Sequence, residues 1–266
     1  MKSFFGYPGG KSRLAKRLLA DLGPVEYYVE PFAGGFSVDL TLLERGPIPV
    51  WLNDLDRDLT CLWSAALRHT DALCERIQST SVTVETFYQV QSRILKDVKR
   101  SLMDRAMDKL IAHKLSYSNM GEMAATPVGG KNQTGDWKFD VRWNPDSICQ
   151  AIRRVAAMFD SVRLTSQSVF KMLPCIPASA LVYLDPPYVT AGGKCYKHSF
   201  SDEDHVQLAM ALRKVKWNWF MTYDDHPLIR HLYAGQYKEI DLRYQMSSAY
   251  RKNQALKTTT ELLITN

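Results

Sequence analysis

The stretch Leu181-Val182-Tyr183-Leu184-Asp185-Pro186-Pro187-Tyr188 decides the fold. Four apolar residues in a row predict a short strand that is buried on both faces, as in a parallel sheet covered by helices. Pro186 restricts Asp185 to an extended conformation, and Pro187 restricts Pro186 in the same way, so the strand ends in a stiff turn. Because neither proline has a backbone N–H, the turn presents one acid, carbonyl acceptors and one aromatic ring.

The chemistry of this turn suits a neutral amine. In open α/β sheets, ligands bind beyond the carboxyl ends of the strands. An ionised Asp185 and the Pro186 carbonyl both accept hydrogen bonds from an –NH₂ group, and Tyr188 is suited to stack on the flat ring that bears the amine. The alternative for a lone Asp-Pro-Pro is a strand-to-loop turn in which the acid caps a helix.

A second motif, Tyr7-Pro8-Gly9-Gly10-Lys11-Ser12, precedes an amphipathic helix predicted over residues 13–19. A phosphate-binding loop needs a glycine five positions before its Gly-Lys-Ser segment, and Phe5 stands there, so that interpretation fails. A ring, two glycines and a cation at the start of a helix instead favour a small anionic group such as a carboxylate. The alternative is an N-terminal arm with a capped helix.

A third motif is Glu30-Pro31-Phe32-Ala33-Gly34-Gly35, which lies between a predicted strand and a helix that extends to about Arg45. Glycine lets the backbone approach a ligand closely. A second strand, predicted over residues 47–53, ends at Asp54, about 20 residues after the glycine turn, where an acid typically binds ribose hydroxyls. Asp54 is alternatively a cap for the helix that begins near Asp56.

Composition sets the bounds. The 266 residues allow one large domain, or a core with a substantial insertion. The net charge of +6 suits a protein that meets phosphates, and equally a slightly basic enzyme. Five cysteines without a Cys-x-x-Cys pair or a histidine at zinc spacing predict reduced thiols in a cytoplasmic protein and no metal site. We expect neither a signal peptide nor a membrane span.

The three motifs, in this order, resemble the Dam family of adenine-specific DNA methyltransferases. The resemblance covers most of the chain and includes the tail, where Arg251-Lys252 and residues 257–264 are similar to the closing strand of the family. It implies an α/β fold, with a Rossmann-like methyltransferase sheet covered by helices on both faces. It also implies a discontinuous catalytic domain, 1–56 and 160–266, with a mostly helical target-recognition domain and its hairpin inserted at 57–159.

The resemblance also implies a cofactor and the residues that hold it. The cofactor would be S-adenosylmethionine, with no metal. The implied catalytic residues are Asp185, Pro186, Pro187 and Tyr188. The implied cofactor-binding residues are Tyr7, Lys11, Pro31, Phe32, Gly34, Asp54, Ser168 and Asp185, with Lys11 at the cofactor carboxylate and Asp54 at the ribose.

Two positions depart from the family pattern. Phe36 stands where a further small residue is common, and Ser168 stands 17 positions before Asp185, where an acid is often found. A hydroxyl group still forms a hydrogen bond with an adenine edge. We therefore expect weaker or rearranged cofactor recognition rather than its loss.

Residues 115–143 are polar, rich in glycine and aromatic, with basic and amide side chains that suit phosphates and base edges. The resemblance implies that they read the DNA. An irregular surface loop is the alternative, and the arginine of the Dam hairpin is absent between Asn119 and Val128, so recognition of GATC is not predicted. The DNA-binding candidates are Asn119, Lys131, Asn132, Lys138 and Arg142, together with Lys197 in the loop after the catalytic strand.

The predicted reaction is direct methyl transfer to the N6 amine of an adenine flipped out of double-stranded DNA, by a protein that is monomeric in solution. Tyr196 and Lys197 are candidates to support the flipped base or its phosphate, and His198 is interpreted as a surface-loop residue. Methylation of the cytosine N4 amine is one alternative. Another is a DNA-binding protein of the same fold with weakened catalysis.

Overall fold

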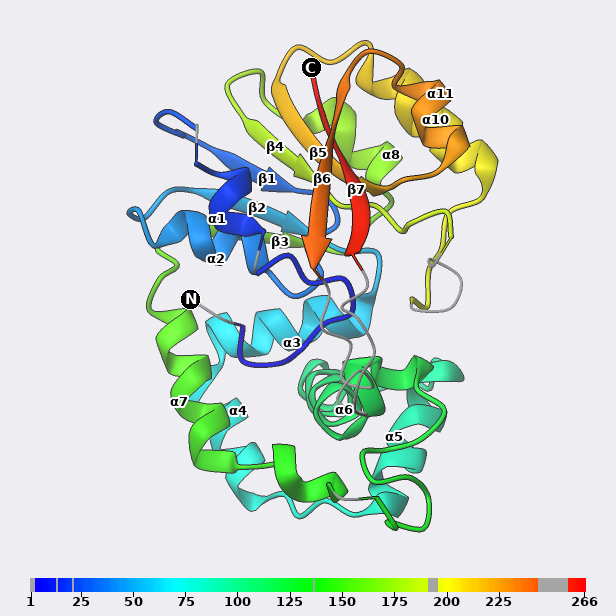
Figure 1. Cartoon of the computed structure of the whole chain (residues 1–266). Coiled ribbons are helices and arrows are strands. Elements are labelled where there is room, and N and C mark those ends of the chain that lie inside the picture. Colours follow the sequence, from blue (N-terminus) through cyan, green and yellow to red (C-terminus); the bar gives the residue numbers. More distant parts are fainter. Residues whose placement is uncertain (1–2, 13, 21, 136, 191–195, 244–257) are drawn as a thin grey trace.

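The computed structural model describes the chain except residues 1–2, 13, 21, 136, 191–195 and 244–257. Within the described residues, seven strands form one sheet in the order β3-β2-β1-β4-β5-β7-β6 (Figure 1). All neighbours are parallel except β7, which runs antiparallel to both β5 and β6. The strands are β1 (Tyr28–Glu30), β2 (Val50–Asn53), β3 (Val162–Thr165), β4 (Leu181–Leu184), β5 (Asn218–Asp224), β6 (Tyr237–Arg243) and β7 (Thr258–Thr265).

Helices cover both faces of this sheet, as expected. Those that precede β3 are α1 (Ala15–Leu18), α2 (Ser37–Leu43), α3 (Arg57–Arg68), α4 (Thr70–Ser79), α5 (Val84–Leu95), α6 (Leu102–Leu115) and α7 (Pro145–Ala156). Those that follow it are α8 (Val169–Met172), α10 (Asp202–Leu212) and α11 (Pro227–Leu232). Figure 1 shows α3 to α7 gathered below the sheet, and α10 and α11 on its other side.

The alternation of side chains along each strand divides the core into two layers. Tyr28 and Tyr183 face the cluster formed with α1 to α7, whereas the next residues in the chain, Val29 and Leu184, face the cluster formed with α8, α10 and α11. Successive side chains of a strand point to opposite faces. Both faces are covered, which explains why β4 reads as a continuous apolar run.

The topology creates a binding position at the carboxyl end of the sheet. From β1 the chain moves outward to β2 and β3, and it then returns to the other side of β1 as β4. Ligands of open α/β sheets bind at such a switch point. Glu30 at the end of β1, Asp54 directly after β2 and Asp185 directly after β4 all lie where these strands end.

The helices between β2 and β3 do not form a separate core. Buried residues of this insertion, such as Phe87 and Leu110, belong to the same cluster as Tyr28 and Leu52 of the sheet. Several of these helices begin at side-chain caps, for instance Thr83 before α5 and Ser101 before α6. The division of the chain at residues 57 and 159 stays a prediction.

Two features differ from expectation. Strand β3 had no sequence prediction, because its residues are only partly buried and its run Val-Arg-Leu-Thr is not continuously apolar. The expected hairpin within 115–143 is represented, in the described residues, by a single antiparallel bridge between Ser116 and Pro127, with two short 3₁₀ turns between these residues and a third at Phe139–Arg142. The closing strand is present as β7, while Arg251, Lys252 and Lys257 lie outside the described residues.

Two further expectations concern cysteines and membranes. Cys61, Cys74, Cys149 and Cys175 are free thiols, and Cys195 lies outside the described residues. None of the helices in the described part of the chain has the length and apolar character needed to cross a bilayer.

Candidate active site

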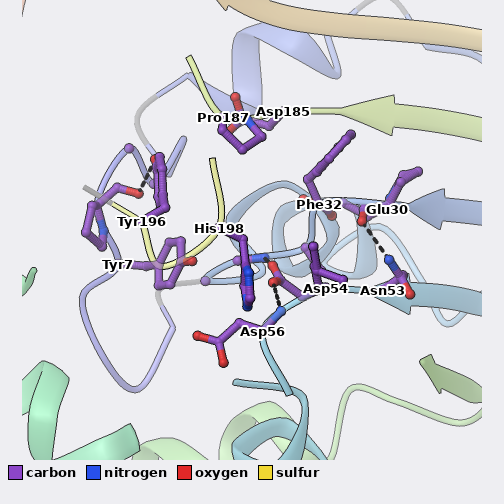
Figure 2. Close-up of a pocket in the computed structure, with 18 of the residues that line it drawn as sticks. Tyr7, Glu30, Phe32, Asn53, Asp54, Asp56, Asp185, Pro187, Tyr196 and His198 are labelled. Carbon is purple, nitrogen blue, oxygen red and sulfur yellow. Dashed lines mark hydrogen bonds between the residues drawn. The ribbon is translucent and has the colours of Figure 1, made fainter. Parts of the chain in front are cut away.

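A pocket lies at the switch point, lined by all three motifs (Figure 2). The N-terminal motif contributes Tyr7 to Lys11, the glycine turn contributes residues 30–35, and Asp185 and Pro187 come from the catalytic turn. Asp54 lines it beyond β2, and Ser168 lines it at the start of α8. Chain folding thus brings together residues that are more than 170 positions apart, as the resemblance implied.

The Asp54 carboxylate is held by two backbone amides. Its Oδ2 accepts from the Gly34 N–H at 3.0 Å, and its Oδ1 accepts from the Asp56 N–H at 2.9 Å. Asp54 is therefore not the cap of α3, because Asp56 fills that role by accepting from the N–H groups of Asp58 and Leu59. Burial, together with the nearby Asp56, raises the pKa of Asp54 to about 6.

The glycine turn is packed directly against Tyr7. A Cβ atom at Gly34 would lie 3.0 Å from the Tyr7 ring, and a Cβ at Gly35 would lie 2.8 Å from the Tyr7 Cβ. Gly34 also has φ of +50°, a backbone conformation in which a residue with a side chain would be strained. The Pro31 carbonyl accepts from the Asn53 side-chain amide at 3.0 Å, which ties the turn to β2. These glycines therefore let the two motifs approach each other.

Phe36 has a structural role of its own. It adopts a left-handed backbone conformation with φ of 56°, and its ring stacks on Trp63 of α3 with the centroids 3.6 Å apart. The Trp63 indole N–H donates to the Gly34 carbonyl at 3.0 Å. The large residue thus packs away from the pocket lining and supports the glycine turn from behind.

Asp185 is contacted from two sides. The Lys11 ammonium lies 3.0 Å from both of its carboxylate oxygens, and Lys11 also donates to the Gly9 carbonyl at 3.0 Å. The Thr222 hydroxyl of β5 donates to Asp185 Oδ1 at 2.9 Å and lies 2.7 Å from the Tyr183 hydroxyl. These partners fix the orientation of the acid.

The electrostatic environment sets the protonation of Asp185. Burial raises its pKa to about 6, while Lys11 lowers the pKa and Glu261 raises it. The carboxylate is therefore ionised at neutral pH and remains able to accept hydrogen bonds.

The remaining residues of the catalytic turn differ in position. Pro187 lines the pocket, and Pro186 is buried beside it. The Tyr188 ring lies outside the lining, with the Lys11 ammonium 4.8 Å from its centroid and the Tyr223 ring 6.1 Å away.

Residues 196–200 close one side of the pocket. The Tyr196 hydroxyl donates to the Pro8 carbonyl at 3.2 Å, and its ring stacks on Tyr7 with the centroids 6.0 Å apart. Phe200 packs edge to face on Phe32 at 5.6 Å. His198 is exposed and lies at the same side of the pocket (Figure 2), in agreement with a surface-loop residue.

Five of the six DNA-binding candidates fall into three groups. Lys131 and Asn132 are exposed and line a shallow groove beside α5. Lys138 is exposed but donates to loop carbonyls, among them Gly135 at 3.2 Å. Asn119 and Arg142 are partly buried and bonded to each other, with Arg142 donating to the Asn119 side-chain oxygen at 2.6 Å.

Lys197 is turned toward the inserted helices. Its ammonium group donates to the Ile94 carbonyl at the end of α5, at 3.4 Å, and lies 4.0 Å from Asp58. It therefore links the loop after the catalytic strand to α3 and α5.

Several residues of the site had no prediction from sequence. Lys109 of α6 is buried and donates to Asp56 at 2.6 Å and to both oxygens of Glu122 at 2.7 and 2.9 Å. All three line the pocket. The helical period did not single out Lys109, because residues 105–113 of α6 are all buried and no one face of the helix stands out. The supporting role of Thr222 had no sequence signal either.

Two further groups of the lining have strongly shifted pKa values. Burial and the proximity of Asp39 raise the pKa of Glu30, whose carboxylate accepts from the Tyr28 hydroxyl at 3.3 Å. Burial and the nearby Lys109 lower the pKa of His113 to about 4, so its imidazole is neutral at pH 7. In the described part of the chain, no group of three or more His, Cys, Asp or Glu side chains is arranged to hold a metal ion.

Sequence comparison supports the interpretation of this geometry. Residues 7–247 match the family described as D12 class N6 adenine-specific DNA methyltransferase. The chain is 23% identical over 240 residues to the Type II methyltransferase M.MjaIII of Methanocaldococcus jannaschii, which covers 81% of this chain and 80% of the relative.

The alignment with a second relative covers 100% of this chain and 100% of the relative. The Type II methyltransferase M.CviBI of Paramecium bursaria Chlorella virus NC1A is 27% identical over 274 residues. The family match includes all three motifs, the inserted helices and most of the sheet. The chain therefore belongs to the D12 class of N6 adenine-specific DNA methyltransferases.

Proposed function

We propose that this protein methylates the N6 amine of adenine at a specific site in double-stranded DNA, with S-adenosylmethionine as the methyl donor. The observation that carries the residue assignment is the ionised Asp185 beside the switch-point pocket, held by Lys11 and Thr222. When bound, the cofactor supplies a methyl group made electrophilic by a cationic sulfur. The residues of the chain bind the cofactor, orient the target amine and neutralise charge.

The pocket fits this cofactor in its donor set. Asp54 offers a carboxylate for ribose hydroxyls, and the Phe32 and Val169 side chains supply apolar walls for a base. Ser168 adds a hydroxyl for a hydrogen bond to that base. Tyr7, Pro31 and Gly34 complete the lining as the resemblance implies.

In this proposal Lys11 contacts both the catalytic Asp185 and the cofactor. An ammonium group has three N–H donors. The Gly9 carbonyl and the Asp185 carboxylate accept two of them, and we assign the third to the cofactor carboxylate. The same cation keeps Asp185 ionised, because a neighbouring positive charge favours the charged form of an acid.

Asp185 and the Pro186 carbonyl orient the target amine. Flipping an adenine out of the duplex costs roughly a few kcal/mol, and stacking on Tyr188 returns about 1–3 kcal/mol of it. Hydrogen bonds to both amine protons align the nitrogen lone pair with the methyl group. Catalysis is then mainly positioning and electrostatic stabilisation.

The DNA is assigned to the inserted helices and the turns that follow them. The exposed Lys131, Asn132 and Lys138 are proposed to contact the phosphate backbone. The Asn119–Arg142 pair is proposed to meet DNA nearer the pocket, since Asn119 packs against Gly6, which directly precedes the N-terminal motif. Lys197 supports the loop beside the flipped base through its contact with α5.

The activity is tested by incubating the protein with labelled S-adenosylmethionine and unmethylated DNA, followed by digestion and identification of the modified nucleoside. The expected product is N6-methyl-2′-deoxyadenosine, and sequencing of the modified DNA gives the site. Label in N4-methylcytosine, or cofactor binding without transfer to DNA, contradicts the proposal.

Replacing Asp54 with alanine is expected to raise KM for S-adenosylmethionine about 10- to 100-fold, because hydrogen bonds to a charged group contribute about 1.5–3 kcal/mol. The value of kcat at saturating cofactor should change much less, since Asp54 does not touch Asp185. Steady-state kinetics at varied cofactor check this, with KM for DNA as the control. A fall in kcat at unchanged KM would remove Asp54 from the cofactor site.

The pH dependence follows from two raised pKa values. Asp54 and Asp185 both have a pKa of about 6, and both must be ionised to work. Activity is therefore lost as the pH falls, and kcat/KM for the cofactor should fall about 100-fold per pH unit well below pH 6, one factor of ten for each proton. The acid limb of kcat should have half this slope and lie at lower pH, since a cationic ligand lowers the pKa of Asp185.

The variant Lys11→Met tests whether the acid limb of kcat is due to Asp185. Lys11 lowers the pKa of Asp185, so its removal should move the acid limb of kcat to higher pH. An acid limb that stays in place would mean that Asp185 is not the titrating group.

We further propose that residues 1–56 and 160–266 carry catalysis and residues 57–159 carry target recognition, in a monomeric cytoplasmic protein. The position of the pocket supports this division, since its catalytic acid and glycine turn come from the sheet. Light scattering with and without DNA tests the monomer.

A further inference from the structure

Strand β5 extends beyond the catalytic strand. Leu184, the last residue of β4, pairs with Met221, and β5 continues to Asp224 while the neighbouring chain turns at Asp185. Three residues of β5, namely Thr222, Tyr223 and Asp224, therefore run beside the catalytic turn. None of them belongs to the three motifs.

Each of these residues contacts a different part of the turn. Thr222 donates to Asp185 Oδ1 at 2.9 Å, and the Tyr223 ring lies 6.1 Å from the Tyr188 ring. The Asp224 carboxylate accepts from two successive amides, Val189 N–H at 3.2 Å to Oδ1 and Thr190 N–H at 2.9 Å to Oδ2. The end of β5 thus supports the catalytic acid, the aromatic ring and the chain that follows.

The two prolines explain why the contact of Asp224 with the Val189 and Thr190 amides matters. Pro186 and Pro187 have no N–H, so the turn itself offers no backbone donor to anchor it until Tyr188. Asp224 takes the two amides directly after Tyr188 with both of its oxygens. Hydrogen bonds to an ionised acceptor are stronger than neutral ones, and two of them fix direction as well as distance.

We infer that Asp224 is a positioning residue for the target base: by holding the Val189 and Thr190 amides, it sets where Tyr188 stacks on the flipped adenine. This inference rests on the proposed function, which assigns Tyr188 to the base. Asp224 touches neither substrate nor cofactor in this role, and it does not line the pocket.

The neighbouring Asp225 provides a matched control. Its carboxylate pairs with Arg230 of α11 at 2.5 and 2.8 Å, on the surface and away from the catalytic turn. Asp225→Ala therefore removes the same charge one residue further on without releasing the Val189 and Thr190 amides.

The experiment compares wild type, Asp224→Ala, Asp224→Asn and Asp225→Ala on DNA that carries the sequenced site. For Asp224→Ala we expect kcat/KM for DNA to fall about 100-fold, the effect of displacing a reacting group by about 1 Å. KM for S-adenosylmethionine and Tm should stay close to those of Asp225→Ala. The Asn variant should be intermediate, because its single amide oxygen accepts one N–H.

Hydrogen exchange provides a readout that does not depend on activity. The Val189 and Thr190 amides should exchange slowly in wild type and in Asp225→Ala, and faster in Asp224→Ala. Unchanged exchange, or DNA kinetics equal to those of Asp225→Ala, would overturn the inference. The inference would also be overturned if Asp224→Ala impaired cofactor binding and Tm as much as it lowered kcat/KM for DNA. A wild-type protein that does not methylate adenine would instead refute the proposed function.

Discussion

Replacing Asp185 with alanine is expected to lower kcat about 1,000-fold or more, because it removes the negatively charged group that is proposed to accept a hydrogen bond from the target amine. Asp185 is held by Lys11 and Thr222 at 3.0 and 2.9 Å, so its carboxylate is already oriented before the base arrives. Single-turnover transfer of a labelled methyl group to DNA measures the loss.

Binding provides the control for this variant. Affinity for DNA should be close to wild type, since the proposed phosphate contacts lie on the inserted helices and the turns after them. The isosteric Asp185→Asn keeps the shape but loses the charge, and we expect it to be nearly as inactive. Full transfer by either variant would mean that the acid after β4 is not the group that orients the amine.

The sequence predicted the framework of the fold because its strongest signals are local. Strand β4, the glycine turn after β1 and the acid after β2 are each contained in fewer than ten residues, and the structure brings their ends to one edge of the sheet. Strand β3 was missed since it is partly exposed and its burial depends on neighbours far away in the chain. Propensity alone is a weak guide to such strands.

The partners within the site were less predictable than its residues. Lys11 was expected at a carboxylate, but its contact with Asp185 joins positions 174 apart in the chain. The contacts of Thr222 and Asp224 follow from the register between β4 and β5, which no local pattern encodes. In the same way, Lys197 was expected at a phosphate or base, and its ammonium group donates to the Ile94 carbonyl at the end of α5, a contact between positions far apart in the chain.

Replacing Lys109 with methionine is expected to destabilise the protein by about 3–5 kcal/mol, because it leaves two buried carboxylates without their cation. Asp56, Lys109 and Glu122 are each at most 5% exposed, and their ion pairs measure 2.6 and 2.7 Å. Although burial favours the neutral acid, Lys109 and its hydrogen bond hold the pKa of Asp56 at about 2. The stability that comes from this lowered pKa of Asp56 is present above pH 4 and is lost as the pH falls toward 2.

The change in free energy is measured by urea unfolding at pH 7, with Arg153→Met as the matched control. Arg153 also pairs with an acid, Asp71 at 2.9 Å, but these side chains are 53% and 82% exposed, so its loss should change stability far less than the loss of Lys109. Adding Asp56→Asn and Glu122→Gln to Lys109→Met should recover part of the loss, since the uncompensated charges are then removed. Equal effects of the buried and the exposed substitutions would contradict the argument. A cofactor KM that rises in Lys109→Met would show that the inserted helix also orients Asp54 through the Asp56 amide.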